Sequence, residues 1–263
     1  MDRLLVLHLQ ASGCVAEAWL NGIPLARVTP ERPRLSLSVH EFTQSGQNRL
    51  ELLIASNETE LTSAQKPQPQ LLRHALGVAL RLQLQPCDGG DTKNLAQLDW
   101  APEQGTRIEI PTRLVEEVLL PVSFPRWRWL DAPLIESTPA LHQRVLDWLQ
   151  ALAFDLSAGQ FDSFTAATAL RTEELALAYQ LTRESEAARL LAHLRQLHAA
   201  DRLQWQALTA DTLRLRPVAG TRLVECLNTS GAPALQSLPD PEGQVVLFSL
   251  RLASVENRLY ALR

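Results

Sequence analysis

The stretch Ala16-Glu17-Ala18-Trp19-Leu20-Asn21-Gly22-Ile23-Pro24-Leu25 decides the fold of the first half of the chain. It predicts a strand, a tight Asn21-Gly22 turn and a returning strand, because both turn residues tolerate a positive φ. Residues 42–52 contain a second glycine turn, at Gly46, that leads into another alternating strand. The chain is therefore expected to begin with an antiparallel β-domain.

Further alternating runs continue this pattern. In residues 35–40 and 78–85, apolar and polar side chains alternate with a period of two, as in half-buried strands. The polar segment 56–70, which contains two prolines, predicts a long surface loop. Together with strands expected around 106–110 and 115–122, the pattern predicts an all-β antiparallel sandwich over residues 1–125.

A linker is expected at residues 126–136. Three prolines between Pro121 and Pro133 interrupt regular structure, and Trp127 and Trp129 lie close together in this stretch. Such indoles can stack on a ligand. We expect them instead to pack the linker against the neighbouring domains.

The period of the apolar residues becomes helical beyond the linker. Thr138 is placed to cap a helix that has Pro139 at its first position and Gly159 at its end. Two further helices are expected over about 172–179 and 185–199. Strands are expected afterwards at 203–208, 213–217, 223–228, 245–253 and 259–262. Helices followed by strands predict an α+β domain over residues 137–263.

Three segments of this second domain carry a resemblance to a known family. They are Leu146-Asp147-Trp148-Leu149-Gln150-Ala151-Leu152, the turn Ala158-Gly159-Gln160-Phe161-Asp162-Ser163-Phe164, and the terminal strand Val246-Leu247-Phe248-Ser249-Leu250-Arg251-Leu252. The order of elements resembles the cone-shaped NTF2-like family, over about half the chain. This resemblance implies helices followed by a curved antiparallel sheet. Members of that family range from enzymes to pure binding modules.

The first domain carries a second resemblance. Trp19-Leu20-Asn21-Gly22 together with Gly46-Gln47-Asn48-Arg49-Leu50 resembles the galactose-binding-like sandwiches that accompany many glycosidases. No obvious set of loop aromatics is present to form a sugar platform. Because fold does not imply function, the resemblance predicts an architecture only.

Composition and charge exclude some classes of function. The 263 residues have a net charge of −4, from 29 acidic and 25 basic side chains, unlike a general nucleic-acid binder. Cys14, Cys87 and Cys226 lack the spacing of a zinc site or a disulfide framework, so we expect buried thiols. No signal-peptide pattern is present, and no run approaches the roughly 18 apolar residues of a membrane span. We expect a cytoplasmic protein that does not contact a membrane.

No constellation of catalytic residues is recognisable. His193 and His198 are five residues apart, whereas a helical zinc pair needs i, i+4 spacing. Asp147, Asp155 and Asp162 can supply carboxylates near the mouth of a cone, but we expect them to be helical surface charge. A G-x-S-x-G elbow, a P-loop and a dinucleotide fingerprint are all absent. We therefore expect neither catalysis nor a cofactor or metal site.

Two acidic groups are the candidate partner-binding residues. One group surrounds the second and third predicted helices, and the other lies in polar loops of the first domain. Facing acidic lobes can select a basic protein partner, because complementary charge speeds association. The alternative role is solvated surface charge, which also stabilises helix N-termini. The two groups are Glu173, Glu174, Glu184 and Glu186, and Glu58, Glu60, Asp88 and Asp91.

The layout of two domains, slightly acidic and without catalytic residues, resembles the immunity proteins of type VI secretion effector-immunity systems. That resemblance implies a protein that binds and neutralises a cognate toxin acting in the cytoplasm, such as a nuclease with a basic surface. A carbohydrate-binding accessory module is one alternative, and it requires exposed Trp or Tyr side chains. An NTF2-like small-ligand-binding protein or enzyme is another, and it requires a pocket between the first helix and the sheet. The partner, the contact face and the oligomeric state stay open.

Overall fold

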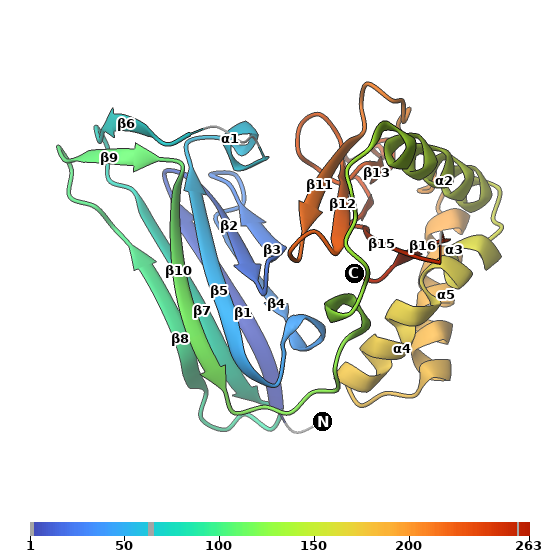
Figure 1. Ribbon diagram of the computed structural model, residues 1–263, viewed down its shortest axis with the longest axis horizontal. Coiled ribbons are helices and arrows are strands. Elements are labelled where there is room, and N and C mark those ends of the chain that lie inside the picture. Colours follow the sequence, from blue (N-terminus) through green and yellow to red (C-terminus); the bar gives the residue numbers. More distant parts are fainter. Residues whose placement is uncertain (1–2, 63–65, 257) are drawn as a thin grey trace. The chain divides into compact units, whose positions relative to one another are not determined.

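The computed structural model describes residues 3–62, 66–256 and 258–263. It is a mixture of antiparallel sheets and helices, as expected of an α+β protein (Figure 1). Its contacts divide the chain into two compact units, residues 1–126 and 127–263. No helix in the described part of the chain is long and apolar enough to cross a membrane.

The first unit contains two four-stranded antiparallel sheets, with strand orders β4-β1-β7-β8 and β10-β5-β2-β3 (Figure 1). A further antiparallel pair is formed by β6 and β9. Alternate residues of the strands are fully buried, among them Leu7, Leu52 and Leu82, and form the apolar core. The strands are β1 (Arg3–Ser12), β2 (Val15–Leu20), β3 (Ile23–Val28), β4 (Arg34–Ser38), β5 (Gly46–Ala55), β6 (Gln68–Leu71), β7 (Gly77–Pro86), β8 (Lys93–Trp100), β9 (Arg107–Ile110) and β10 (Thr112–Leu120).

The predicted Asn-Gly hairpin is confirmed. Strands β2 and β3 pair across Asn21 and Gly22, whose φ angles are 53° and 75°. The Asn21 side chain donates to the Asn48 Oδ1 atom at 2.8 Å and accepts from the Arg49 backbone N–H at 3.0 Å. Asn48 is 1% exposed and also binds the backbone of Gln44 at 2.8 Å. The two turns that the sequence singles out therefore hold each other in place.

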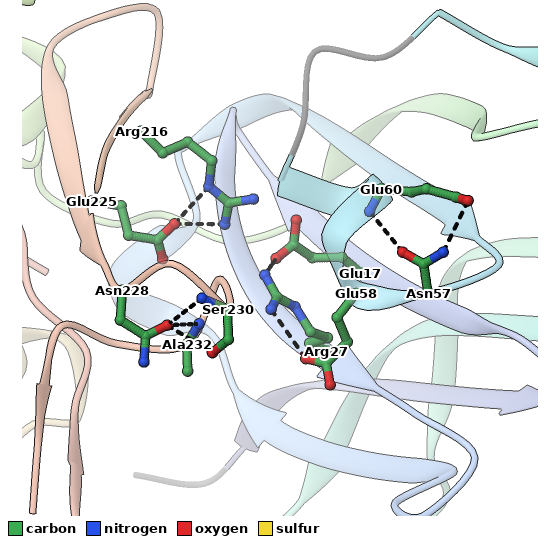
Figure 2. Close-up of polar contacts among 10 residues, drawn as sticks. All are labelled: Glu17, Arg27, Asn57, Glu58, Glu60, Arg216, Glu225, Asn228, Ser230 and Ala232. Atoms are coloured by element: carbon green, nitrogen blue, oxygen red, sulfur yellow. Dashed lines mark hydrogen bonds and ion pairs between the residues drawn. The ribbon is translucent and has the colours of Figure 1, made fainter. Parts of the chain in front are cut away.

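The prediction of a long surface loop at 56–70, of which residues 63–65 lie outside the described residues, is wrong in part. A short helix, α1 (Glu58–Thr62), begins there, and β6 follows it. Asn57 Oδ1 accepts the Glu60 backbone N–H at 3.1 Å (Figure 2). A Glu60 carboxylate oxygen accepts the Ser56 N–H at 2.9 Å. This reciprocal cap satisfies backbone donors at the helix start. The pattern Asn57-x-x-Glu60 is the feature of the sequence that indicates the start of this helix.

The second unit combines four helices with a sheet of order β11-β12-β15-β16 (Figure 1). Its core joins apolar residues of the long helix α2, such as Leu149 and Leu152, to Val224 and Leu252 of the sheet. The helices are α2 (Pro139–Ser157), α3 (Asp162–Ala167), α4 (Ala169–Ala178) and α5 (Arg183–Ala199). The strands are β11 (Arg214–Val218), β12 (Leu223–Leu227), β13 (Leu235–Gln236), β14 (Leu247–Phe248), β15 (Arg251–Val255) and β16 (Arg258–Ala261). Two 3-10 turns complete the chain, η1 (His40–Phe42) in the first unit and η2 (Arg128–Leu130) in the second.

Three expectations for this unit need correction. Residues 203–208 form no strand and contribute a single bridge between Trp205 and Ser237, because their hydrogen bonds to the β13 region are irregular. The expected strand 245–253 is split between β14 and β15. The stretch around Phe164, expected to be a turn into the second helix, is itself the helix α3.

The two tryptophans of the expected linker are buried. Trp127 is 1% exposed and Trp129 is 2% exposed.

The start and end of α2 follow the prediction. Thr138 Oγ1 accepts the Leu141 backbone N–H at 3.1 Å, and Pro139 occupies the first helical position. Gly159 follows the helix with a φ of 72°. A Cβ atom at this position would lie 3.0 Å from two atoms of the His198 ring. Both the backbone and the neighbouring ring therefore require glycine here.

Gly159→Ala is expected to lower the free energy of unfolding by about 1–2 kcal/mol from the left-handed backbone alone, and further through the contact with His198. Gly243→Ala is the matched control, because Gly243 has a φ of 78° and open space around the added carbon. Urea denaturation of both variants separates the two costs. Equal losses would contradict the role assigned to the His198 contact.

Candidate ligand site

The first predicted acidic group is largely used inside the second unit. Glu174 is 3% exposed, accepts the Arg128 backbone N–H at 2.6 Å and pairs with Arg263 at 2.5 Å. Glu173 pairs with Arg128 at 2.8 Å and with Arg183 at 2.9 Å. These carboxylates hold α4 to the surrounding chain.

The other two residues of this group lie on α5 and differ from each other. Glu186 is 5% exposed and pairs with Arg189 at 2.8 Å. Glu184 is exposed in the first turn of the helix, where a negative charge is favourable. Of the four predicted residues, only Glu184 thus presents a fully exposed carboxylate.

The acidic residues of the first unit also divide into two sets. Glu58 pairs with Arg27 at 3.3 Å, and Arg27 in turn pairs with the buried Glu17 at 2.9 Å (Figure 2). Glu60 belongs to the cap of α1 described above. Asp88 and Asp91 are exposed in the turn between β7 and β8. Asp88, Asp91 and Glu58 are therefore the exposed members of this group, and Glu58 is already paired with Arg27.

The thiols are not all buried, so the expectation for Cys87 is wrong. Cys14 and Cys226 are 2% exposed, whereas Cys87 is exposed in the turn after β7, next to Asp88. Burial raises the pKa of Cys14 to about 11 and raises the pKa of Cys226 further. The reactive thiolate is therefore scarce at both buried positions.

Native alkylation at about pH 8 is expected to label Cys87 alone, because its thiol is exposed, whereas burial raises the pKa of Cys14 and of Cys226. All three cysteines are expected to react in urea. Mass spectrometry of the peptides checks the order of labelling. Equal native labelling of Cys14 and Cys87 would contradict the burial of Cys14.

The space between α2 and the sheet is filled by the apolar core. An open cavity lies instead between α2, α3 and β16, which is an edge strand of its sheet. It has a volume of about 430 Å³. Arg144 and Trp148 line it from successive turns of α2, Ser163, Ala166 and Ala167 line it from α3, and residues 258–260 line it from β16.

The polar side chains around this cavity carry hydrogen-bond donors. Arg144 and Arg258 are guanidinium groups, which donate and cannot accept. One Arg144 Nη atom donates to Ser254 Oγ at 2.9 Å, which orients this side chain. The Ser163 Oγ atom is buried and has no hydrogen-bond partner among the described residues. A buried hydroxyl that has no hydrogen-bond partner and lies beside a cavity can form a hydrogen bond with a ligand atom.

Three further cavities share a lining residue with this one, and one of them, of about 330 Å³, shares Ala166 and is lined by Arg183. A cavity of about 550 Å³ shares Arg144 and is also lined by Glu136 and Glu256. Another, of about 520 Å³, shares Ser163 and is lined by Asp155, Asp162 and Arg195. Two of the three aspartates considered from the sequence therefore line one cavity. The third, Asp147, accepts a hydrogen bond from Gln143 at 2.7 Å on the exposed face of α2.

The two histidines considered from the sequence, His193 and His198, both lie on α5. His198 packs edge-on against Phe161, with ring centroids 6.0 Å apart. His193 is exposed on α5. Within residues 3–62, 66–256 and 258–263, no three His, Cys, Asp or Glu side chains gather as a metal site would require.

The sequence did not reveal the residues of the cavity. Arg144 and Arg258 lie 114 positions apart and belong to no motif. In the sequence, Trp148 stands within the first expected helix and Ser163 within the expected turn at 158–164. One usable signal was Arg144 four residues before Trp148, beside an otherwise apolar helical stripe. No family model, curated protein or solved structure matches this chain.

Proposed function

We propose that this protein is a non-catalytic binding protein whose second unit takes a small ligand in the cavity between α2, α3 and β16. The observation that carries the proposal is a cavity of about 430 Å³ that combines apolar walls with oriented hydrogen-bond donors. Small-molecule sites are typically concave, mostly apolar and supplied with a few placed polar groups. The volume lies in the usual range for such sites, about 300–1,000 Å³.

The residues of the cavity favour binding over catalysis. Its polar lining among the described residues consists of two guanidinium groups and the hydroxyls of Ser163 and Tyr260. Guanidinium groups stay protonated near neutral pH and act as hydrogen-bond donors to a ligand. The order of helices α2 to α5 followed by an antiparallel sheet supports an NTF2-like architecture, a fold that serves binding modules as well as enzymes.

A fragment library screened by ligand-observed NMR tests this proposal. Ala166→Trp is the informative variant, because Ala166 is exposed on α3 and lines the cavity, so an indole can fill it without disturbing the core. Ala151→Trp, on the exposed side of α2, is the matched control. Fragments are expected to bind the wild type and the control but not Ala166→Trp. Fragments that bind all three proteins equally would overturn the proposal.

The neutralisation of a toxin is the second candidate function. The observation that favours it is the exposed pair Asp88 and Asp91 in the β7–β8 turn. A basic partner, such as a nuclease of a type VI secretion system, would be attracted to such carboxylates. Co-purification with the product of the adjacent reading frame tests this candidate. Asp88→Lys with Asp91→Lys is expected to weaken that association, whereas Ala166→Trp is expected to leave it unchanged.

A further inference from the structure

We infer that the ligand of the cavity between α2, α3 and β16 is an organic anion, a carboxylate or phosphate monoester attached to an apolar body. The inference rests on the proposed function, because it names the chemical class that this cavity selects. Its basis is the distribution of charge between the cavity and the neighbouring cavities that share Arg144 or Ser163 with it.

Two positively charged side chains line this cavity. Arg144 and Arg258 both line it, and no described lining residue is acidic. The adjoining cavity that shares Arg144 carries Glu136 and Glu256, and the one that shares Ser163 carries Asp155 and Asp162 with Arg195. The acids of this region thus lie in the neighbouring cavities, and the central one is suited to a negative group.

The donors are of the kind that bind an oxyanion. Guanidinium groups form strong, charge-assisted hydrogen bonds with carboxylates and phosphates. The bond from Arg144 to Ser254 Oγ limits the freedom of that side chain before any ligand arrives. The buried hydroxyl of Ser163 has no partner among the described residues and can donate a further hydrogen bond. Because β16 pairs only with β15 among the described strands, those of its backbone N–H groups that do not bond to β15 are additional potential donors.

The apolar walls of this cavity favour a ligand that has an apolar body over a bare inorganic ion. Trp148, Ala166, Ala167 and Leu259 contribute apolar surface to the same cavity. Inorganic phosphate would leave this surface in contact with water, whereas an aromatic or aliphatic body would cover it. A volume of about 430 Å³ accommodates a body of one or two rings together with its charged group.

Calorimetric titration with naphthoate, naphthyl phosphate and naphthamide tests this inference, since the three probes share a body and differ in charge. Naphthoate or naphthyl phosphate is expected to bind at least about tenfold more tightly than naphthamide, because the neutral amide cannot replace the ionic hydrogen bonds. The stronger of the two anions identifies the class of head group. Inorganic phosphate alone is expected to give no measurable heat.

Two variants test whether Arg258 causes the preference for an anion over the amide. Arg258→Ala is expected to weaken the anion by about tenfold and to leave naphthamide unchanged. The side chain is exposed, so its removal does not threaten the fold. Arg195→Ala is the matched control, because it removes the same charge from an exposed side chain in the neighbouring cavity. It is expected to change neither affinity.

The possible results distinguish the choice of an anion as ligand from the existence of the ligand cavity. Equal binding of anion and amide, both abolished by Ala166→Trp, would overturn the choice of an anion and retain the ligand cavity. Binding of any probe that Ala166→Trp does not affect would overturn the cavity itself. An absence of binding by all three probes would overturn the inference, while the fragment screen would still decide the proposed function.

Discussion

Replacing Glu174 by alanine is expected to destabilise the second unit by about 3–5 kcal/mol, because the change removes the carboxylate that pairs with a buried cation. The side chains of Arg263 and Glu174 are 1% and 3% exposed, and their atoms lie 2.5 Å apart. The Arg263 guanidinium also lies 5.7 Å from the Trp127 ring centroid. Glu174 further accepts the Arg128 backbone N–H. Its removal therefore weakens several attachments at once.

Urea denaturation followed by tryptophan fluorescence measures this loss, since four of the six tryptophans lie in residues 127–263. Glu184→Ala is the matched control, because the same residue type is exposed one helix further on. Its expected change is within about 0.5 kcal/mol. Glu174→Gln keeps an acceptor for Arg128 and isolates the effect of the charge. A loss no larger than that of Glu184→Ala would contradict the internal role of Glu174.

Asn48→Ala is expected to destabilise the first unit by about 2–4 kcal/mol, since it removes several hydrogen bonds of a buried side chain. Asn48 accepts from the Asn21 side chain and from the Gln44 N–H, and it donates to the carbonyls of Gln44 and Gly46. The variant leaves these groups short of partners at a position that is 1% exposed. It also loosens the contact between the hairpin turn and β5.

Gln47→Ala is the matched control for Asn48→Ala, because Gln47 is the exposed neighbour in the same strand. Amide hydrogen exchange at Arg49 is the most specific readout, since its N–H donates to Asn21 Oδ1. Faster exchange there is expected in Asn48→Ala and not in Gln47→Ala. Unchanged exchange in both variants would show that Asn48 does not connect the two turns.

Local signals in the sequence were sufficient where backbone chemistry decides the structure. Asn21 and Gly22 adopt positive φ angles that few other residues adopt, so the hairpin could be placed to the residue. Thr138, Pro139 and Gly159 defined α2 for the same reason. The prediction of a strand at 203–208 is wrong because an extended chain with irregular hydrogen bonds has the same apolar pattern as a strand.

The site could not be predicted because it depends on distant parts of the chain. Glu173 and Glu174 are adjacent in sequence, yet one is partly exposed and the other is buried against Arg263. Charge alone does not distinguish these roles. Likewise, Arg144 and Arg258 meet at one cavity only because α2 and β16 pack together in the fold. Tertiary packing, and no local motif, brings these residues together.

The crystal structure of the protein soaked with naphthoate tests the central claim most directly. The account predicts electron density for the probe between α2, α3 and the edge of β16, with its carboxylate beside Arg144 or Arg258. Naphthoate bound instead against the carboxylates of Glu136 and Glu256, or only on the first unit, would contradict it.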